Sequence, residues 1–128
     1  MTSLKIKRLD HIVLTVSDLA RATRFYHEVF DMPILEETET VATLRCGHQL
    51  LKLQTTTRKD ALIAKTPTVG SADLCLVTGD DLDDDINHLK SYFVDIIAGP
   101  LTKTGANGKM TSIYINDPDG NLIEISEY

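Results

Sequence analysis

The last segment of the chain, residues 117–126, constrains the fold more than any other. It opens with Asp-Pro-Asp-Gly, which is typical of a tight turn, because Pro118 presets φ and Gly120 accepts positive φ without a steric penalty. The Leu-Ile-Glu-Ile-Ser that follows predicts a strand, whose period of two places Glu124 opposite its aliphatic neighbours. Such a carboxylate must be solvated, paired with a cation or bound to a metal.

The chain has 128 residues, 42% of them hydrophobic, which fits one compact domain over residues 1–128. A net charge of −6 without a basic stripe argues against nucleic acid as a partner. No apolar run has the length of a membrane span, and the N-terminus lacks the apolar core of a signal peptide, so no membrane partner and a cytoplasmic location are expected. Cys46 and Cys75 are expected as reduced thiols. The acidic run at 80–85 favours a solvated helix start over a calcium loop.

Apolar periodicity predicts the order βαβββ, written twice. Strands are expected over residues 9–16, 34–37, 40–46, 50–54, 72–78, 96–98, 110–115 and 122–126. One helix is expected from a cap at Ser17 or Asp18 to Phe30, and a second from Asp80 onward, with Leu82, Ile86, Leu89 and Phe93 on its apolar face. The polar stretch 55–71 is interpreted as a linker with a helical turn at 61–64.

The two halves can be overlaid strand on strand. The overlay matches His11 with Asp73, and Lys52 with Glu124. A duplicated unit of this kind predicts a pseudo-symmetric sheet whose equivalent strands line one shared cavity. His11 by itself is more typical of a hydrogen-bonded core histidine. Asp73 lies in the apolar segment Ala-Asp-Leu-Cys-Leu, where an acid is costly unless it is paired. Together, His11, Asp73 and Glu124 therefore favour a metal or ligand site.

Three motifs carry a resemblance to a known family. They are the first strand with His11, the Ser-Asp-Leu-x-x-Ala-x-x-Phe-Tyr helix start at 17–26, and the Asp-Pro-Asp-Gly-Asn-Leu-Ile-Glu-Ile ending. Together they resemble the vicinal oxygen chelate superfamily (glyoxalase I, extradiol dioxygenases, bleomycin-resistance proteins), and within it the small glyoxalase domain-containing branch. The resemblance implies an α+β fold of two βαβββ modules, about 4–56 and 70–128, joined by a linker at 57–69. These form a curved mixed eight-stranded sheet with an open cup.

The resemblance also implies a divalent metal in the cup, with one ligand from each of four strands. His11 and Glu124 match the first and last ligands, Glu124 being also the catalytic residue, and Asp73 stands where His is usual. By the overlay the remaining position is Lys52, a cation, so Gln54 two residues along is expected as the ligand. The metal (Zn, Ni, Mn or Fe) would act as a Lewis acid on vicinal oxygens of a small-molecule substrate.

The resemblance leaves alternatives open. Lys52 could occupy the metal's place, which would make the chain a metal-free small-molecule binding or antibiotic-resistance protein of the same fold. It could also hold an anionic substrate, with Arg45, Lys109 and Tyr114 as further candidates for the pocket wall. A homodimer is expected, because short members often build each site from one module of each subunit. Whether modules pair within a chain or between chains is not fixed by the sequence.

Overall fold

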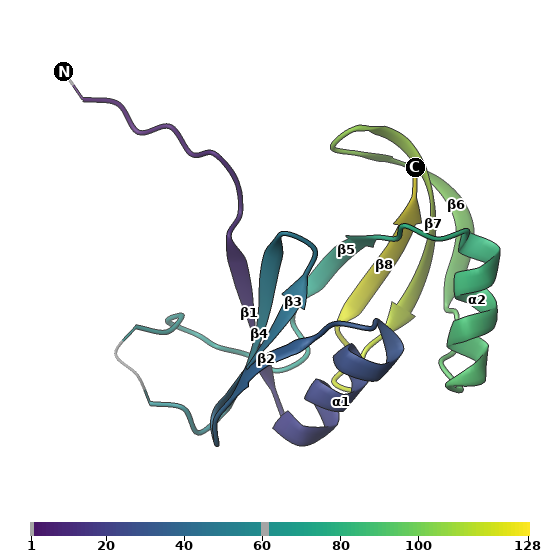
Figure 1. Ribbon diagram of the computed structural model, residues 1–128. Coiled ribbons are helices and arrows are strands. Elements are labelled where there is room, and N and C mark those ends of the chain that lie inside the picture. Colours follow the sequence, from purple (N-terminus) through teal and green to yellow (C-terminus); the bar gives the residue numbers. More distant parts are fainter. Residues whose placement is uncertain (1, 60–61) are drawn as a thin grey trace.

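The computed structural model describes residues 2–59 and 62–128, which contain eight strands and two helices (Figure 1). The strands are β1 (His11–Val16), β2 (Ile34–Glu37), β3 (Val41–Cys46), β4 (Gln49–Thr55), β5 (Asp73–Val77), β6 (Ala98–Gly105), β7 (Gly108–Asn116) and β8 (Leu122–Glu127), and the helices are α1 (Leu19–Val29) and α2 (Leu82–Ser91). The order βαβββ occurs twice. The prediction of an α+β fold built from two such modules is confirmed.

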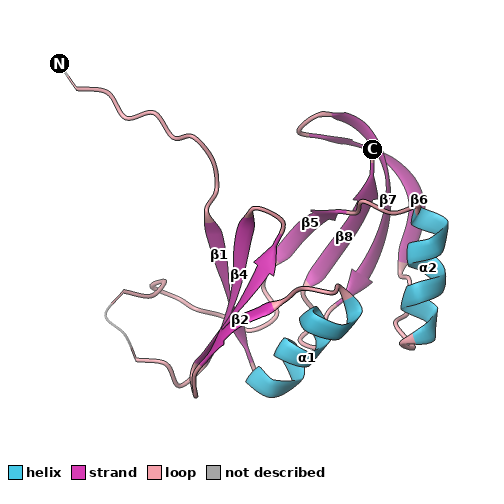
Figure 2. Cartoon of the chain, in the orientation of Figure 1, coloured by secondary structure: helices cyan, strands magenta, loops and turns pink. Residues whose placement is uncertain are grey.

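The eight strands form two sheets of four, one for each module (Figure 2). The strand orders are β1-β4-β3-β2 and β5-β8-β7-β6. In each sheet the first pair is parallel, and the other pairs are antiparallel. The two sheets therefore have the same topology, as expected of a duplicated unit.

Helix α1 begins where the sequence predicts. Asp18 is the N-cap, and its side chain accepts a hydrogen bond from the backbone N–H of Arg21 at 3.1 Å. Its apolar stripe buries Ala22, Tyr26 and Val29 in a core shared by both sheets. The helix thus joins the two modules instead of covering only its own.

Two side-chain contacts tie the turn before β8 to the start of α1 and to the segment that leads into β5. Both side-chain oxygens of Asp119 accept from the Ser17 backbone N–H, at 3.4 and 3.2 Å, and the Ser17 hydroxyl also donates to Asp119. The Asn121 side chain accepts from the Ala72 backbone N–H at 2.8 Å. The turn before β8 is therefore an anchor for segments that lie far from it in sequence.

Two expectations about the second module were wrong. Strand β6 spans Ala98–Gly105 instead of the expected 96–98, because the polar residues after Pro100 form an exposed edge strand that pairs with β7. Such a strand has no apolar alternation to reveal it. Phe93 does not lie on the apolar face of α2: the helix ends at Ser91, and Phe93 is 94% exposed with φ of 58°.

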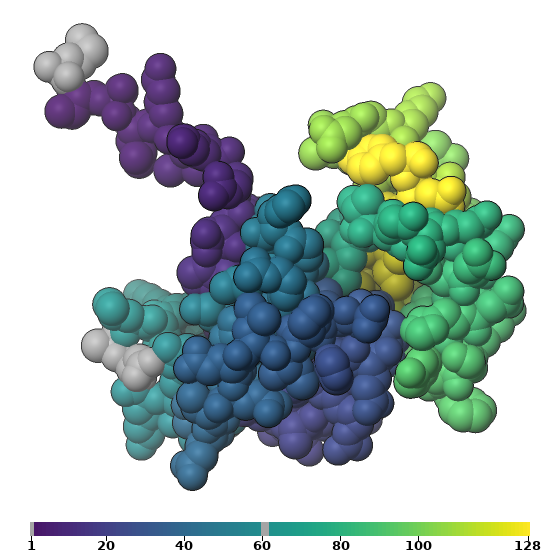
Figure 3. Space-filling view, in the orientation of Figure 1, coloured from purple at the N-terminus to yellow at the C-terminus, as the bar shows by residue number. Residues whose placement is uncertain are grey.

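The expected helical turn at 61–64 falls partly on Ala61, which lies outside the described residues, and 62–64 are not helical. Residues 2–10 form an extended arm that projects from the body of the molecule (Figure 3). In the part of the chain that the structure covers, neither helix is long and apolar enough to cross a membrane.

Candidate functional site

Each sheet has one face against the core and one face open. In the first sheet the parallel register pairs His11 with Leu50, Val13 with Lys52 and Thr15 with Gln54. Because paired residues project to the same side, these six residues share the open face. The opposite face carries Leu14, Leu51 and Leu53, which are buried in the core.

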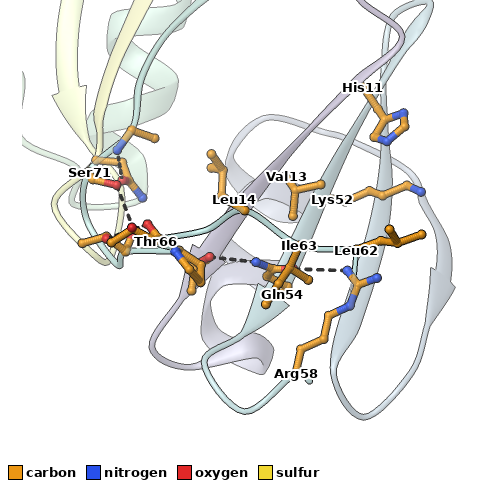
Figure 4. Close-up of a pocket in the computed structure, with 16 residues that line it drawn as sticks. His11, Val13, Leu14, Lys52, Gln54, Arg58, Leu62, Ile63, Thr66 and Ser71 are labelled. Atoms are coloured by element: carbon orange, nitrogen blue, oxygen red, sulfur yellow. Dashed lines mark hydrogen bonds between the residues drawn. The ribbon is translucent and has the colours of Figure 1, made fainter. Parts of the chain in front are cut away.

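A cavity of about 470 Å³ lies over this open face (Figure 4). His11, Lys52, Gln54 and Arg58 line it on the sheet side, and residues of the linker between Leu62 and Ser71 line the other side. Figure 4 shows the side chains of His11, Lys52 and Arg58 one after another on the same side of the sheet. The linker, interpreted from sequence only as a connection, is therefore part of the pocket wall.

His11 is oriented by its neighbour. Its Nδ1 lies 2.8 Å from Asp10 Oδ1. A carboxylate only accepts hydrogen bonds, so Nδ1 carries the donated proton, and Nε2 of the neutral ring keeps its lone pair. The bond to His11 lowers the pKa of Asp10. A carboxylate behind a histidine in this way is the usual arrangement behind a metal-binding imidazole.

Gln54 is only 4% exposed, and both ends of its amide are in use. Its Nε2 donates to Thr15 Oγ1 at 2.9 Å, and its Oε1 accepts from Arg58 Nη1 at 3.2 Å. Gln54 faces the cavity as a ligand would, but its oxygen already holds a guanidinium. That oxygen keeps a second lone pair, which is the one that could bind a metal.

Glu124 lies on the open face of the second sheet, paired with Cys75 on one side and Tyr114 on the other. The Ser126 hydroxyl donates to Glu124 Oε2 at 3.3 Å. Partial burial and the Glu124 carboxylate raise the pKa of Tyr114, so the phenol stays protonated beside the acid. Asp73 is exposed at the start of β5, on this same face.

The structure thus brings the predicted residues together in two groups. His11, Lys52 and Gln54 share the first sheet, and Asp73, Tyr114 and Glu124 share the second. Among the residues that the structure describes, no three side chains of His, Cys, Asp or Glu gather closely enough to hold a metal ion. The donor types suit a divalent metal, but one copy of the chain does not assemble them.

The register supports the overlay of the two halves. Lys52 pairs with Val13, two residues after His11, and Glu124 pairs with Cys75, two residues after Asp73. Lys52 is therefore the counterpart of Glu124. By the same count Gln54 corresponds to Ser126, on the same open face.

Two candidates for the pocket wall lie elsewhere. Arg45 lines a separate cavity of about 770 Å³ between the end of α1 and α2. Lys109 is an odd number of positions from Tyr114 along β7, so it projects from the opposite face, where it lies near Asp81 and Glu127. Neither side chain shares a cavity with His11.

Sequence reasoning missed Arg58 and the hydroxyl groups behind Glu124. Ser112 and Ser126 are fully buried, their hydroxyl oxygens lie 2.7 Å apart, and Cys75 Sγ lies 3.2 Å from Ser126 Oγ. Side chains alternate between the two faces of β7 and β8, and this alternation places both serines on the same face as Glu124. The sequence pattern could therefore have predicted them as neighbours of Glu124. Arg58 follows a strand in a polar stretch, where no sequence pattern indicates which way a side chain points.

Comparison with known proteins agrees with this architecture. The model of the Glyoxalase/Bleomycin resistance protein/Dioxygenase superfamily matches residues 8–125. The virulence protein STM3117 of Salmonella typhimurium is 42% identical over 96% of this chain and 85% of its own length. An integron cassette protein, VCH_CASS1 of V. cholerae, has a TM-score of 0.93 with 42% identity over 99% of both chains.

More distant relatives include enzymes. Metallothiol transferase FosB of Staphylococcus haemolyticus is 28% identical over 94% of this chain and 83% of its own. A lactoylglutathione lyase of Agrobacterium tumefaciens has a TM-score of 0.77 and 25% identity, over 96% of this chain and 95% of its own. On the extent of these matches, the chain belongs to the Glyoxalase/Bleomycin resistance protein/Dioxygenase superfamily.

Proposed function

We propose that this protein is a metal-dependent enzyme of the glyoxalase/dioxygenase type that acts on a small molecule with neighbouring oxygen atoms. In this proposal two copies of the chain complete each site: one contributes His11, and the other contributes Asp73 and Glu124. The proposal rests on the orientation of His11. Its Nδ1 is held by Asp10, and its Nε2 is left as a ligand on a sheet face that the chain's own helices do not cover.

The metal, when bound, would supply a Lewis acid for the substrate oxygens. The chain's own residues have separate roles. Asp10 fixes the His11 ring, and Ser126 holds Glu124 through the bond to Oε2. Tyr114 stays protonated beside Glu124 and can donate a hydrogen bond to a substrate oxygen. Gln54 would be the fourth ligand, through the second lone pair of the amide oxygen that accepts from Arg58.

The relatives support this choice of reaction class. Two relatives of this chain are named as a metallothiol transferase and a lactoylglutathione lyase. A common fold does not by itself define the chemistry, so the proposal depends on the ligands that this chain presents.

The test is the metal content of protein purified without chelator from medium supplied with zinc, nickel, manganese and iron. We expect metal in the wild type, its loss in His11→Ala, and its retention in His48→Ala, which removes an exposed turn imidazole. Equal and negligible metal in all three proteins would reject the proposal.

The position of Lys52 favours a second candidate function. A cation stands where the second sheet has Glu124, as it would in a metal-free binding protein. Such a protein would show a ligand-dependent rise in melting temperature that chelator leaves unchanged. A rise that chelator abolishes would favour the metal-dependent enzyme.

A further inference from the structure

We infer that the cavity over the first sheet binds the anionic group of a small molecule, a carboxylate or a phosphonate, with Lys52 and Arg58 as its cationic partners. The inference rests on the proposed function in one respect, that this cavity holds the substrate. It adds the substrate class. The anion site itself requires no metal.

The described residues that line the cavity carry a net positive charge. Of the described residues that line the cavity, Lys52 and Arg58 carry full positive charges and none is a carboxylate. This contrasts with a net charge of −6 for the chain. Within the described residues no ion pair involves Lys52. Its charge helps to lower the pKa of Asp10, but the Asp10 carboxylate makes its hydrogen bond to His11. A partner for the Lys52 ammonium is therefore left for a ligand to supply.

Arg58 is held in place by a buried side chain. Gln54 is buried and anchored by Thr15, and its Oε1 receives Arg58 Nη1 (Figure 4). The guanidinium is thus positioned by a buried amide that is itself fixed. Since a guanidinium has five N–H donors, this bond is compatible with a further acceptor. A planar fork of donors and an ammonium on the wall of one cavity match the oxygens of a carboxylate or phosphonate.

The rest of the wall suggests what the anion is attached to. The linker contributes hydroxyl groups from Thr66, Thr68 and Ser71, and the cavity also has apolar side chains, including Val13 and Ile63. A volume of about 470 Å³ suits a small molecule. The expected ligand therefore combines one anionic end with a compact apolar part.

The placement of Lys52 beside His11 also couples the anion to the proposed metal. A lone cation at His11 would be repelled by the ammonium, and an anion at Lys52 removes that repulsion. We therefore expect the metal and the anion to strengthen the binding of each other.

The test uses the chelator-treated protein, residues 1–128, at low ionic strength, titrated with phenylphosphonate, phenylacetate and the neutral phenylacetamide. We expect the two anions to bind and the amide to bind at least about tenfold more weakly, since a charge-assisted hydrogen bond is lost. Whichever anion binds more tightly identifies the group. Equal binding of the amide would overturn the inference.

Variants complete the experiment. Lys52→Met should weaken anion binding about tenfold or more, Lys52→Arg should retain most of it, and Lys90→Met, on the exposed side of α2, should leave it unchanged. Circular dichroism confirms folding of each variant. Unchanged binding in Lys52→Met would reject the inference. Because these titrations contain no metal, protein that binds anions but never takes up metal would retain this inference and reject only the metal-dependent function.

Discussion

The Tyr26 hydroxyl donates a 2.7 Å hydrogen bond to Asp117 Oδ2, joining α1 to the turn that precedes β8. Asp117 is only 5% exposed, and it accepts three further hydrogen bonds: from Asp119 N and Asn121 N at 2.9 Å, and from Asn121 Nδ2 at 2.7 Å. Burial and the bond to Asp117 raise the pKa of Tyr26, so it remains a donor. The Asp-Pro-Asp-Gly turn thus holds the two modules together.

Replacing Tyr26 with Phe should destabilise the fold without changing its shape. The substitution removes one donor from a buried carboxylate, which costs about 1.5–3 kcal/mol for a hydrogen bond to a charged group. Urea unfolding measures the loss. Tyr92→Phe is the control, because Tyr92 is 43% exposed and its hydroxyl makes no hydrogen bond to any residue the structure describes. Equal stability of the two variants would contradict this role for Tyr26.

Gly70 should not tolerate a side chain. Its φ is +74°, and an added Cβ would lie 2.7 Å from the backbone oxygen of Asp119. Gly70→Ala is therefore expected to cost about 1–3 kcal/mol, from strain at positive φ and from displacement of the turn. Gly79→Ala is the matched control, because its Cβ would meet no atom within 4 Å and its φ is not positive. Thermal unfolding that affects both variants equally would contradict this reason.

The fold could be predicted from the sequence, but only some of the residues of the candidate site could. Period-two and helical patterns located both modules, because their core positions, such as Leu14 and Ile123, are consistently apolar. The exposed edge strand β6 and the end of α2 before Phe93 were missed because solvent-facing positions carry no such pattern. Asp117 and Asp119 were recognised as turn formers, yet their bonds to Tyr26 and Ser17 depend on how the modules pack, which local sequence does not encode.

Cys75 should react slowly with alkylating agents, and Glu124 should be part of the reason. Burial raises the pKa of the Cys75 thiol, and the nearby Glu124 carboxylate raises it further. Glu124→Gln removes that negative charge, so the pKa falls, more thiolate is present at pH 8, and alkylation is faster. Site-resolved mass spectrometry separates Cys75 from Cys46. In the control Glu37→Gln, on exposed β2, the Cys75 rate should stay at the wild-type value.

If faster alkylation is absent from Glu124→Gln at every pH, the carboxylate does not act on the thiol. Added zinc offers an independent check. A metal at Glu124 would neutralise the carboxylate, so zinc should accelerate Cys75 alkylation in the wild type but not in Glu124→Gln.

Metal binding should be rescued when two inactive variants are mixed, because His11 and Glu124 lie on different sheets. In a dimer that shares its sites, His11→Ala and Glu124→Ala each destroy both sites. A mixed dimer, however, has one site with both residues intact and one with neither. After unfolding and refolding an equal mixture, about half of the dimers are mixed, so metal content should return to about one quarter of the wild-type value. The separately refolded variants should stay near zero. Sites formed within single chains would give no recovery, so a mixture as empty as its components, while the wild type holds metal, would show that His11 and Glu124 meet in one chain.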